Sequence, residues 1–126
     1  MSEAANSTTT VIINVSFNED VEVVKAFIKD EQIPFISGLG VEKLKRFEWF
    51  FNDDETAATL VEVFDDGAAF AELGGKALGT PVNLRFRELV NIESLTILGS
   101  ISDEFKARLA SMGAKVQSYM GGFSFQ

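Results

Sequence analysis

The chain has 126 residues, of which 46% are hydrophobic and 24% are charged, and these values are typical of one globular domain rather than of a disordered or membrane protein. Acidic residues outnumber basic ones by 19 to 11, so the net charge of -8 argues against nucleic acid or an anionic membrane surface as a partner. The absence of cysteine and histidine excludes disulfides, thiolate nucleophiles and the usual zinc and haem ligands, which leaves any chemistry to carboxylates, amides, hydroxyls, Lys and Arg.

The N-terminal segment MSEAANSTTT is polar and lacks the basic start and apolar middle of a signal peptide. We therefore expect a cytoplasmic protein in which residues 1–10 form a flexible arm and residues 11–126 form a single domain. No apolar run approaches the roughly 20 residues of a bilayer span, so we expect no membrane partner.

The first strand is predicted over residues 11–17, where β-branched residues dominate and alternate residues share an apolar face. That face carries Val11, Ile13, Val15 and Phe17. Asn18 is placed to cap the helix that follows. Apolar residues then recur at helical spacing until Pro34, where we expect the helix to end.

Two strands joined by a turn are predicted over residues 42–51 and 56–64, with Asn52-Asp53-Asp54-Glu55 supplying the turn. A turn tip at Asp53-Asp54 places Trp49 opposite Ala58 and Lys45 opposite Glu62. The predicted faces are Phe47, Trp49, Phe51, Leu60 and Phe64 on one side, and Arg46, Glu48, Phe50, Thr59, Val61 and Val63 on the other. Because both faces carry apolar residues, we expect both to be covered.

Five further elements complete the chain. They are a helix capped by Asp65 or Asp66, a short helix from Thr80 and Pro81, a strand over residues 92–99, a helix that Ser102 caps and Gly113 ends, and a strand over residues 114–120. We expect Gly74 and Gly75 to weaken or end the first of these helices. The order βαββαβ followed by a helix and a strand predicts an α+β, ferredoxin-like antiparallel sheet with helices on one face.

Three stretches carry a resemblance to a known family. They are Phe47-Glu48-Trp49-Phe50, the Asn52-Asp53 turn, and Leu60-Val61-Glu62-Val63-Phe64-Asp65 leading into the Ala68-Ala69-Phe70 helix. With a weaker likeness through residues 92–99 and Gly122-Phe123, the chain resembles the antibiotic biosynthesis monooxygenase-like proteins of the dimeric α/β barrel group. The resemblance implies a homodimer whose sheets pack face to face, with a pocket between the sheet and the helices of each subunit.

The resemblance also implies an activity. The best-understood members of the family oxidise anthrone- or quinol-type aromatics with molecular oxygen and no cofactor. A separate branch degrades haem with a His ligand, which this chain lacks. Asn14 matches, by residue type and by element, an Asn that some relatives place against the substrate.

Asn14 and Glu48 are the candidate catalytic residues. Asn14 lies on the half-polar face of the first strand, where its amide can bind a substrate carbonyl or stabilise an oxyanion. Glu48 is a mid-strand carboxylate in an apolar setting and is the candidate base. Each also has a structural explanation, because Asn14 can be an ordinary hydrogen-bonded strand residue and Glu48 can pair with Arg46.

The candidate substrate-binding residues are Trp49, Phe50, Glu62 and Tyr119. Trp49 and Phe50 offer ring faces to an aromatic ligand, although rings on such a sheet more often belong to a core or an interface. Glu62 is a second mid-strand carboxylate, and Lys45 opposite it would supply an ion pair. Tyr119 can extend the same apolar cavity or simply finish the last strand.

We expect a homodimer that binds a small apolar or aromatic molecule, uses no metal or cofactor, and acts as a monooxygenase on an aromatic or quinol-type compound. The alternative is a non-catalytic dimer that binds a ligand or has a structural role. RNA binding on the sheet is less favoured, because the chain is acidic. The deciding feature is whether Asn14 and Glu48 converge on a cavity that holds a perturbed carboxylate.

Overall fold

The computed structural model describes residues 7–125, so residues 1–6 of the predicted arm lie outside the described part of the chain. The sheet has five strands in the order β2-β3-β1-β4-β5. In chain order these are β1 (Thr9–Phe17), β2 (Leu44–Phe51), β3 (Ala57–Phe64), β4 (Val90–Leu98) and β5 (Lys115–Gln117). Neighbouring strands are antiparallel, except for the parallel pair of β4 and β5.

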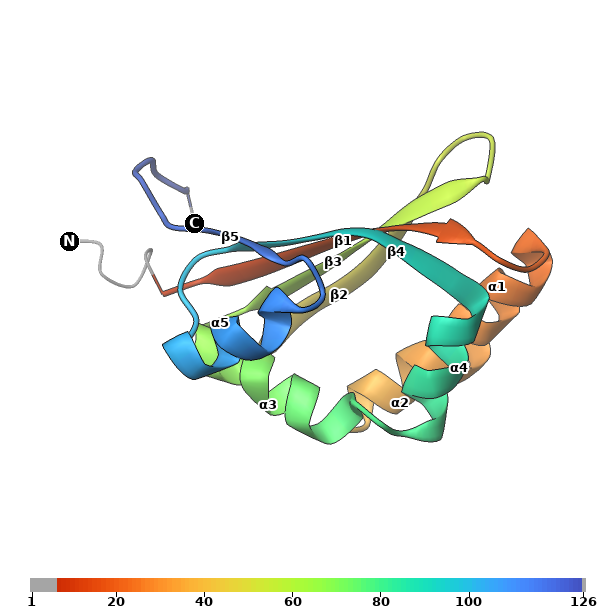
Figure 1. Ribbon diagram of the computed structural model, residues 1–126, viewed down its shortest axis with the longest axis horizontal. Helices are drawn as coiled ribbons and strands as arrows, with labels where there is room; N and C mark the ends of the chain where they lie inside the picture. Colours follow the sequence, from red (N-terminus) through yellow and green to blue (C-terminus); the bar gives the residue numbers. More distant parts are fainter. Residues whose placement is uncertain (1–6, 126) are drawn as a thin grey trace.

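The helices gather on one side of this sheet (Figure 1). They are α1 (Val21–Phe27), the π-helical turn η2 (Ile28–Gln32), α2 (Ile33–Ser37), α3 (Gly67–Ala77), α4 (Pro81–Leu89) and α5 (Asp103–Ala110). The arrangement confirms the predicted α+β ferredoxin-like fold, with a helix and a strand appended after β4. Every helix between residues 7 and 125 falls short of the length and apolarity that a membrane crossing needs.

The first and last strands differ in extent from the prediction. β1 begins at Thr9, two residues earlier than expected, because the Thr9 side chain is fully buried and the residue pairs with Phe64 of β3. β5 spans three residues instead of the predicted 114–120. The residues that follow it are exposed, so nothing in the described chain extends that edge of the sheet.

The first helix starts and ends differently from the prediction. Asp20 caps it by accepting a hydrogen bond from Glu22 N at 2.8 Å, whereas the Asn18 side chain donates to Glu88 O. Pro34 does not end the helix, because the chain first makes the wide turn η2, in which Ile33 N donates to Ile28 O rather than to the carbonyl four residues back. Widening of this kind accommodates a proline, which has no N–H and whose ring crowds the preceding turn.

The later helices follow the predicted caps. Side chains of Asp66, Thr80 and Ser102 each accept a hydrogen bond from a backbone N–H in the first turn. Gly74 and Gly75 lie inside α3, which continues to Ala77. The glycines therefore do not end this helix, because its buried side chains, including Phe70 and Leu73, anchor it to the sheet.

The hairpin of β2 and β3 has the predicted faces but a different register. Trp49 lies opposite Leu60, and Phe47 lies opposite Glu62, a shift of two residues from the predicted pairs. The cause is the turn: Asn52 N donates to Ala57 O, and residues 53–56 form a four-residue loop in which Glu55 has a φ of 58°. A shift of two residues preserves the side on which each residue lies but changes its neighbours.

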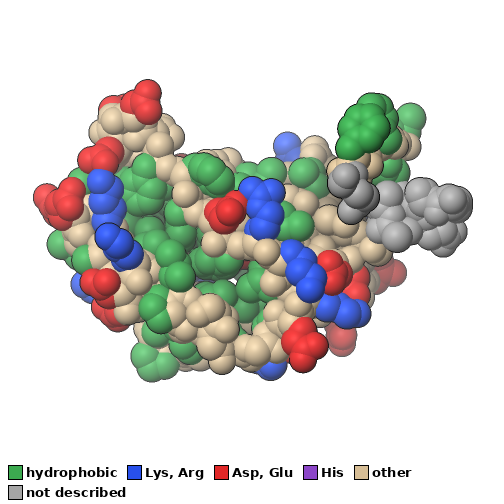
Figure 2. Space-filling view, turned by 180° about the vertical axis from the view of Figure 1, so that it is seen from behind, with side chains coloured by type: hydrophobic (Ala, Val, Ile, Leu, Met, Phe, Trp, Pro, Cys, Tyr) green, Lys and Arg blue, Asp and Glu red, His purple; other side chains and the backbone are tan. Residues whose placement is uncertain are grey.

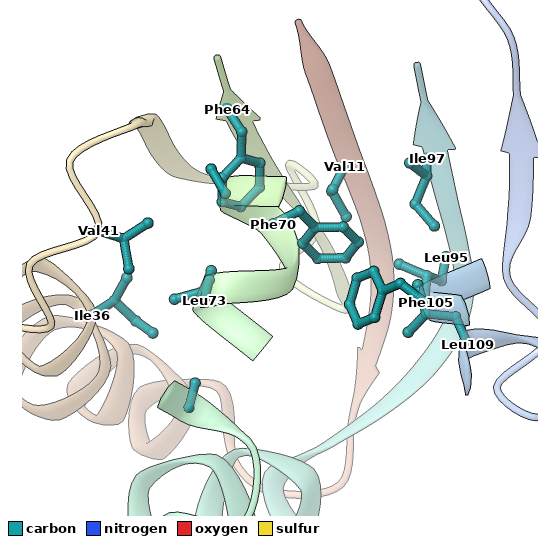
Figure 3. Packing of buried hydrophobic residues seen from close by; sticks show 12 residues of the cluster. Val11, Ile36, Val41, Phe64, Phe70, Leu73, Leu95, Ile97, Phe105 and Leu109 are labelled. Carbon is teal, nitrogen blue, oxygen red and sulfur yellow. The ribbon is translucent and has the colours of Figure 1, made fainter. Parts of the chain in front are cut away.

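The core between sheet and helices has two clusters. One lies beneath β1, β3 and β4 and is closed by α3 and α5, where the Phe70 ring packs against those of Phe64 and Phe105 at 5.4 and 5.1 Å (Figure 3). The other lies toward α1 and α4 and contains Phe27 and Phe86, whose rings are 6.4 Å apart. Together the clusters fix the helices against one sheet face.

Candidate functional site

A pocket of about 130 Å³ lies between the sheet and the helices. Residues of both core clusters line it, including Leu60 of β3, Phe70 of α3 and Phe86 of α4. Figure 2 shows hydrophobic side chains gathered in the hollowed middle of one face, between the acidic and basic side chains that flank it. The pocket therefore offers a largely apolar surface.

Glu62 supplies a carboxyl group to this pocket. It lies in the middle of β3, on the face that the helices cover, and it is 6% exposed. Among residues 7–125, its Oε1 is the only fully buried side-chain oxygen or nitrogen that lacks a hydrogen-bond partner. Burial raises the pKa of Glu62 to about 8, because the charged form loses the hydration that stabilises it in water.

The ion pair predicted between Lys45 and Glu62 does not form. With the observed register the residue opposite Glu62 is Phe47, and Lys45 instead lies 3.5 Å from Asp65. Glu62 consequently carries its proton in most molecules at neutral pH. In this state it can donate a hydrogen bond or a proton, and in its ionised fraction it can accept one.

Three other polar residues line the same pocket. Gln32, at the end of η2, is 6% exposed, and its Oε1 accepts a hydrogen bond from Trp49 Nε1 at 2.8 Å. Asn83 and Arg87 lie one turn apart on α4. The pocket thus combines apolar walls with a few polar groups, an arrangement typical of small-molecule sites.

The structure divides the predicted site residues between the two faces of the sheet. Trp49 and Glu62 lie on the helix-covered face. Asn14, Glu48 and Phe50 lie on the open face, away from the pocket. Tyr119 lies in the segment after β5, where its hydroxyl donates to Gly122 O at 3.1 Å.

The partners of Asn14 and Glu48 are now defined. Asn14 accepts a hydrogen bond from Thr59 Oγ1 at 2.6 Å and donates one to Ser94 Oγ at 2.9 Å. Glu48 Oε1 accepts from Arg46 Nε at 2.8 Å and from Nη2 at 2.5 Å, as the pairing on this face predicted. Within the described chain, therefore, these two residues do not converge on the pocket that holds the perturbed carboxyl.

Sequence reasoning missed Gln32, Asn83 and Arg87. A signal for Gln32 was present, because it follows the buried residues Val24 and Ile28 at intervals of four. The predicted helix end at Pro34 concealed it. A polar residue that continues an apolar helical stripe indicates a buried polar group with a partner.

The strand order and the helices on one sheet face define the class of structure: a ferredoxin-like α+β subunit with a pocket between its sheet and its helices. No protein-family model and no curated protein matches the sequence. Solved structures do match the fold. MupZ from Pseudomonas fluorescens is similar over 95% of this chain and 96% of its own, with 20% identity and a TM-score of 0.80.

Two further structures agree with this class. SnoaB from Streptomyces nogalater, described as a cofactor-independent oxygenase, matches 76% of this chain and 95% of its own, with 12% identity and a TM-score of 0.64. A Chloroflexus aurantiacus protein named for antibiotic biosynthesis monooxygenases matches the same shares, with 11% identity and a TM-score of 0.58. At such identities the likeness establishes the fold alone.

Proposed function

We propose that this protein is a homodimeric small-molecule enzyme in which Glu62 transfers a proton to or from a largely apolar ligand bound between the sheet and the helices. The observation that carries the proposal is the Glu62 carboxyl, which is buried in the pocket without a hydrogen-bond partner at Oε1. A perturbed acid in a pocket is a candidate catalytic group.

A purely structural role explains Glu62 poorly. A buried carboxyl without a partner costs free energy, and an apolar side chain of similar size would fill the same position without that cost. The residue lies among Leu60, Phe64 and other apolar neighbours, so a leucine there would continue the pattern of β3. A functional use of the carboxyl accounts for this local instability.

The first candidate reaction is oxygenation without a cofactor. The ionised fraction of Glu62 removes a proton from an acidic O–H group, or from an acidic C–H group next to the ring, of an aromatic substrate. The resulting phenolate or carbanion then reacts with molecular oxygen in an apolar pocket. The substrate supplies the electrons: one oxygen atom enters the product as a carbonyl in place of two hydrogens, and the other leaves as water. Support comes from the shared fold of SnoaB, described as a cofactor-independent oxygenase.

A redox-neutral reaction is the second candidate. Because the pKa of Glu62 is raised to about 8, its protonated form predominates at pH 7 and can donate to a carbonyl, hydroxyl or ether oxygen of the ligand. The pH dependence separates the two reactions. A base requires the carboxylate, so its rate rises as the pH passes through about 8, whereas the rate of an acid falls over the same interval.

The open sheet face supports the proposed homodimer. It carries Phe50, which is 52% exposed, and the half-exposed residues Ile12, Val61 and Val63. Two such faces packed together would remove this apolar surface from water. The predicted sites at Asn14 and Glu48 would then lie at the subunit interface rather than in the pocket.

Oxygen uptake by the purified full chain, with hydroquinone and methylhydroquinone as single-ring probes, tests the proposal. Glu62→Gln should lower the rate by roughly 100-fold to 10,000-fold, because it removes the proton-transfer group while keeping its shape. Glu48→Gln is the matched control, since it makes the same change on the neighbouring strand but on the opposite face, and it should leave the rate within about threefold.

Three results would redirect the proposal. Product formation without oxygen uptake would favour the redox-neutral reaction. Full activity of Glu62→Gln, with loss of activity in Glu48→Gln, would move the site to the open face. No turnover of any probe, with a bound molecule of constant mass in native mass spectrometry, would favour a ligand-binding protein without catalysis.

A further inference from the structure

We infer that the side-chain amide of Gln32 binds an oxygen atom of the ligand and that Trp49 positions this amide, so that the ligand is an apolar ring or chain bearing a carbonyl or phenolate oxygen. The inference rests on the proposed function, since it takes the pocket at Glu62 as the ligand site. It adds the chemical class of the ligand and a residue that recognises it.

The orientation of the Gln32 amide is fixed by its partner. An indole N–H is a donor only, so the Gln32 atom 2.8 Å from Trp49 Nε1 must be the carbonyl oxygen. The NH₂ group therefore occupies the other branch of the amide. This assignment removes the usual ambiguity between the oxygen and nitrogen of a glutamine side chain.

The Gln32 NH₂ group is available to a ligand. None of the described residues accepts a hydrogen bond from it. Within residues 7–125, Glu62 Oε1 is the only fully buried polar side-chain atom without a partner. The nitrogen thus keeps some contact with solvent. Because Gln32 is 6% exposed and lines the pocket, that contact is with the pocket.

The π-helical turn brings Gln32 to this position. Its hydrogen bond from Ile33 N to Ile28 O spans five residues instead of the four of an α-helix. One extra residue rotates the following side chains by about 100° around the helix axis. Turns of this kind often occur at functional sites. Here η2 ends at Gln32, which lines the pocket.

Trp49 is held firmly enough to act as the positioning residue. Its ring packs edge-on against Phe86 at 5.8 Å and against Phe51 at 6.4 Å. Both contacts restrict the indole, and its N–H in turn restricts the amide of Gln32. An oriented donor at the wall of an apolar pocket favours ligands that place an acceptor oxygen there and disfavours apolar ligands of the same shape.

The size and walls of the pocket set the rest of the ligand class. A cavity of about 130 Å³ is of the order that accommodates a benzene ring. Phenylalanines from β2, α3, α4 and α5 line it, namely Phe47, Phe70, Phe86 and Phe105. The free N–H of Gln32 requires an acceptor, and a carbonyl or phenolate oxygen attached to a ring meets that requirement.

Binding of two isosteric probes to the full chain tests this inference. Acetophenone and α-methylstyrene have nearly the same shape and differ in a C=O or C=CH₂ group. Their dissociation constants are measured by amide chemical-shift titration, and the ratio of the two constants is compared between variants. Gln32→Leu should reduce the preference for acetophenone by roughly threefold to tenfold, the effect of one net hydrogen bond.

Three variants keep the test independent of folding defects. Gln32→Met keeps the length of the side chain but has no N–H donor, so it should lower the ratio as Gln32→Leu does. Trp49→Phe should lower it by about twofold to threefold, because the amide remains but is no longer oriented. Glu104→Gln, at an exposed position of α5 outside the pocket lining, should leave the ratio unchanged.

The outcomes separate the two proposals. If wild type binds α-methylstyrene and neither Gln32 variant changes the ratio, the inference fails while the pocket remains the ligand site. If wild type binds neither probe, the pocket itself fails as the site and both proposals are overturned. If Gln32→Leu lowers the ratio and Trp49→Phe does not, the positioning role of Trp49 is wrong.

Discussion

The two faces of the sheet each carry a glutamate, one exposed and paired and the other buried and without a partner at Oε1. Glu48 lies on β2 and Glu62 on the adjacent strand β3. The residue opposite Glu48 is Val61, which directly precedes Glu62 in the chain. Glu48 is on the open face, 46% exposed and paired with Arg46. Glu62 is on the helix-covered face, buried and without a partner at Oε1. The side of the strand, rather than the residue type, decides which carboxyl is chemically perturbed.

The largest expected effect concerns the pH dependence of stability. Because the pKa of Glu62 is about 8 in the folded protein and 4.5 for an unperturbed glutamate, as in the unfolded chain, the folded protein holds a proton that the unfolded chain releases between these pH values. Stability from this residue is therefore full below pH 4.5 and declines as the pH rises through 8. The total is about 5 kcal/mol, at about 1.4 kcal/mol for each pH unit.

Urea unfolding at pH 5 and pH 9 measures this effect. Relative to Glu62→Gln, wild type should lose about 4 kcal/mol between the two conditions. The comparison of the two proteins at each pH removes the contribution of the other titrating groups. An equal pH dependence of both proteins would show that Glu62 meets water or a counter-charge in the folded state.

The next largest effect concerns the open face. Phe50→Asp should weaken the homodimer by at least about 30-fold in dissociation constant, because it places a charge in the proposed interface. Native mass spectrometry across a dilution series measures it. Leu84→Asp is the control, since Leu84 is 56% exposed on α4. A wild-type protein that remains monomeric at every concentration would refute the interface.

Asn14→Ala has a smaller expected effect. It removes the hydrogen bonds with Thr59 and Ser94, and we expect thermal unfolding to show a loss of about 1 kcal/mol. Turnover of a pocket ligand should stay within about threefold of wild type. A loss of turnover without a loss of stability would instead support Asn14 as the oxyanion-binding residue.

The smallest expected effect is that of Glu48→Gln on stability. The Arg46 and Glu48 side chains are 54% and 46% exposed, and an ion pair of this kind contributes less than about 1 kcal/mol. A change larger than that in denaturant unfolding of the protein would indicate that the pair becomes buried in the proposed interface between two open faces. Such a result would place the Arg46–Glu48 pair inside the interface rather than at its edge.

Strand patterns predicted much of this fold. Alternation of apolar residues placed Val11 and Ile13, and likewise Trp49 and Leu60, on a shared apolar face. Cap residues, namely Asp65 or Asp66, Thr80 and Ser102, predicted three helix starts. These signals are local, since they depend on residues close together in the chain. The fold class follows from their order.

The site was harder to predict, because it depends on register and helix phase. The turn sequence suggested a two-residue tip, whereas the four-residue loop shifts β2 by two positions, which replaces Lys45 with Phe47 opposite Glu62. Pro34 suggested a helix end, whereas the π-helical turn carries Gln32 into the pocket. The sequence of the turn is compatible with a two-residue or a four-residue loop, and Pro34 is compatible with a helix end or a widened turn, so these local signals alone did not decide between the alternatives.

The proton that Glu62 carries also makes ligand binding calorimetrically distinctive. A phenolic ligand that binds as its anion beside a proton-bearing carboxyl releases its own proton to the buffer, so the heat of binding differs between phosphate and Tris. A ketone that only accepts a hydrogen bond releases none, and its heat is the same in both. The number of protons released on binding therefore indicates whether the ligand gives up a proton or only accepts a hydrogen bond, before any product has been identified.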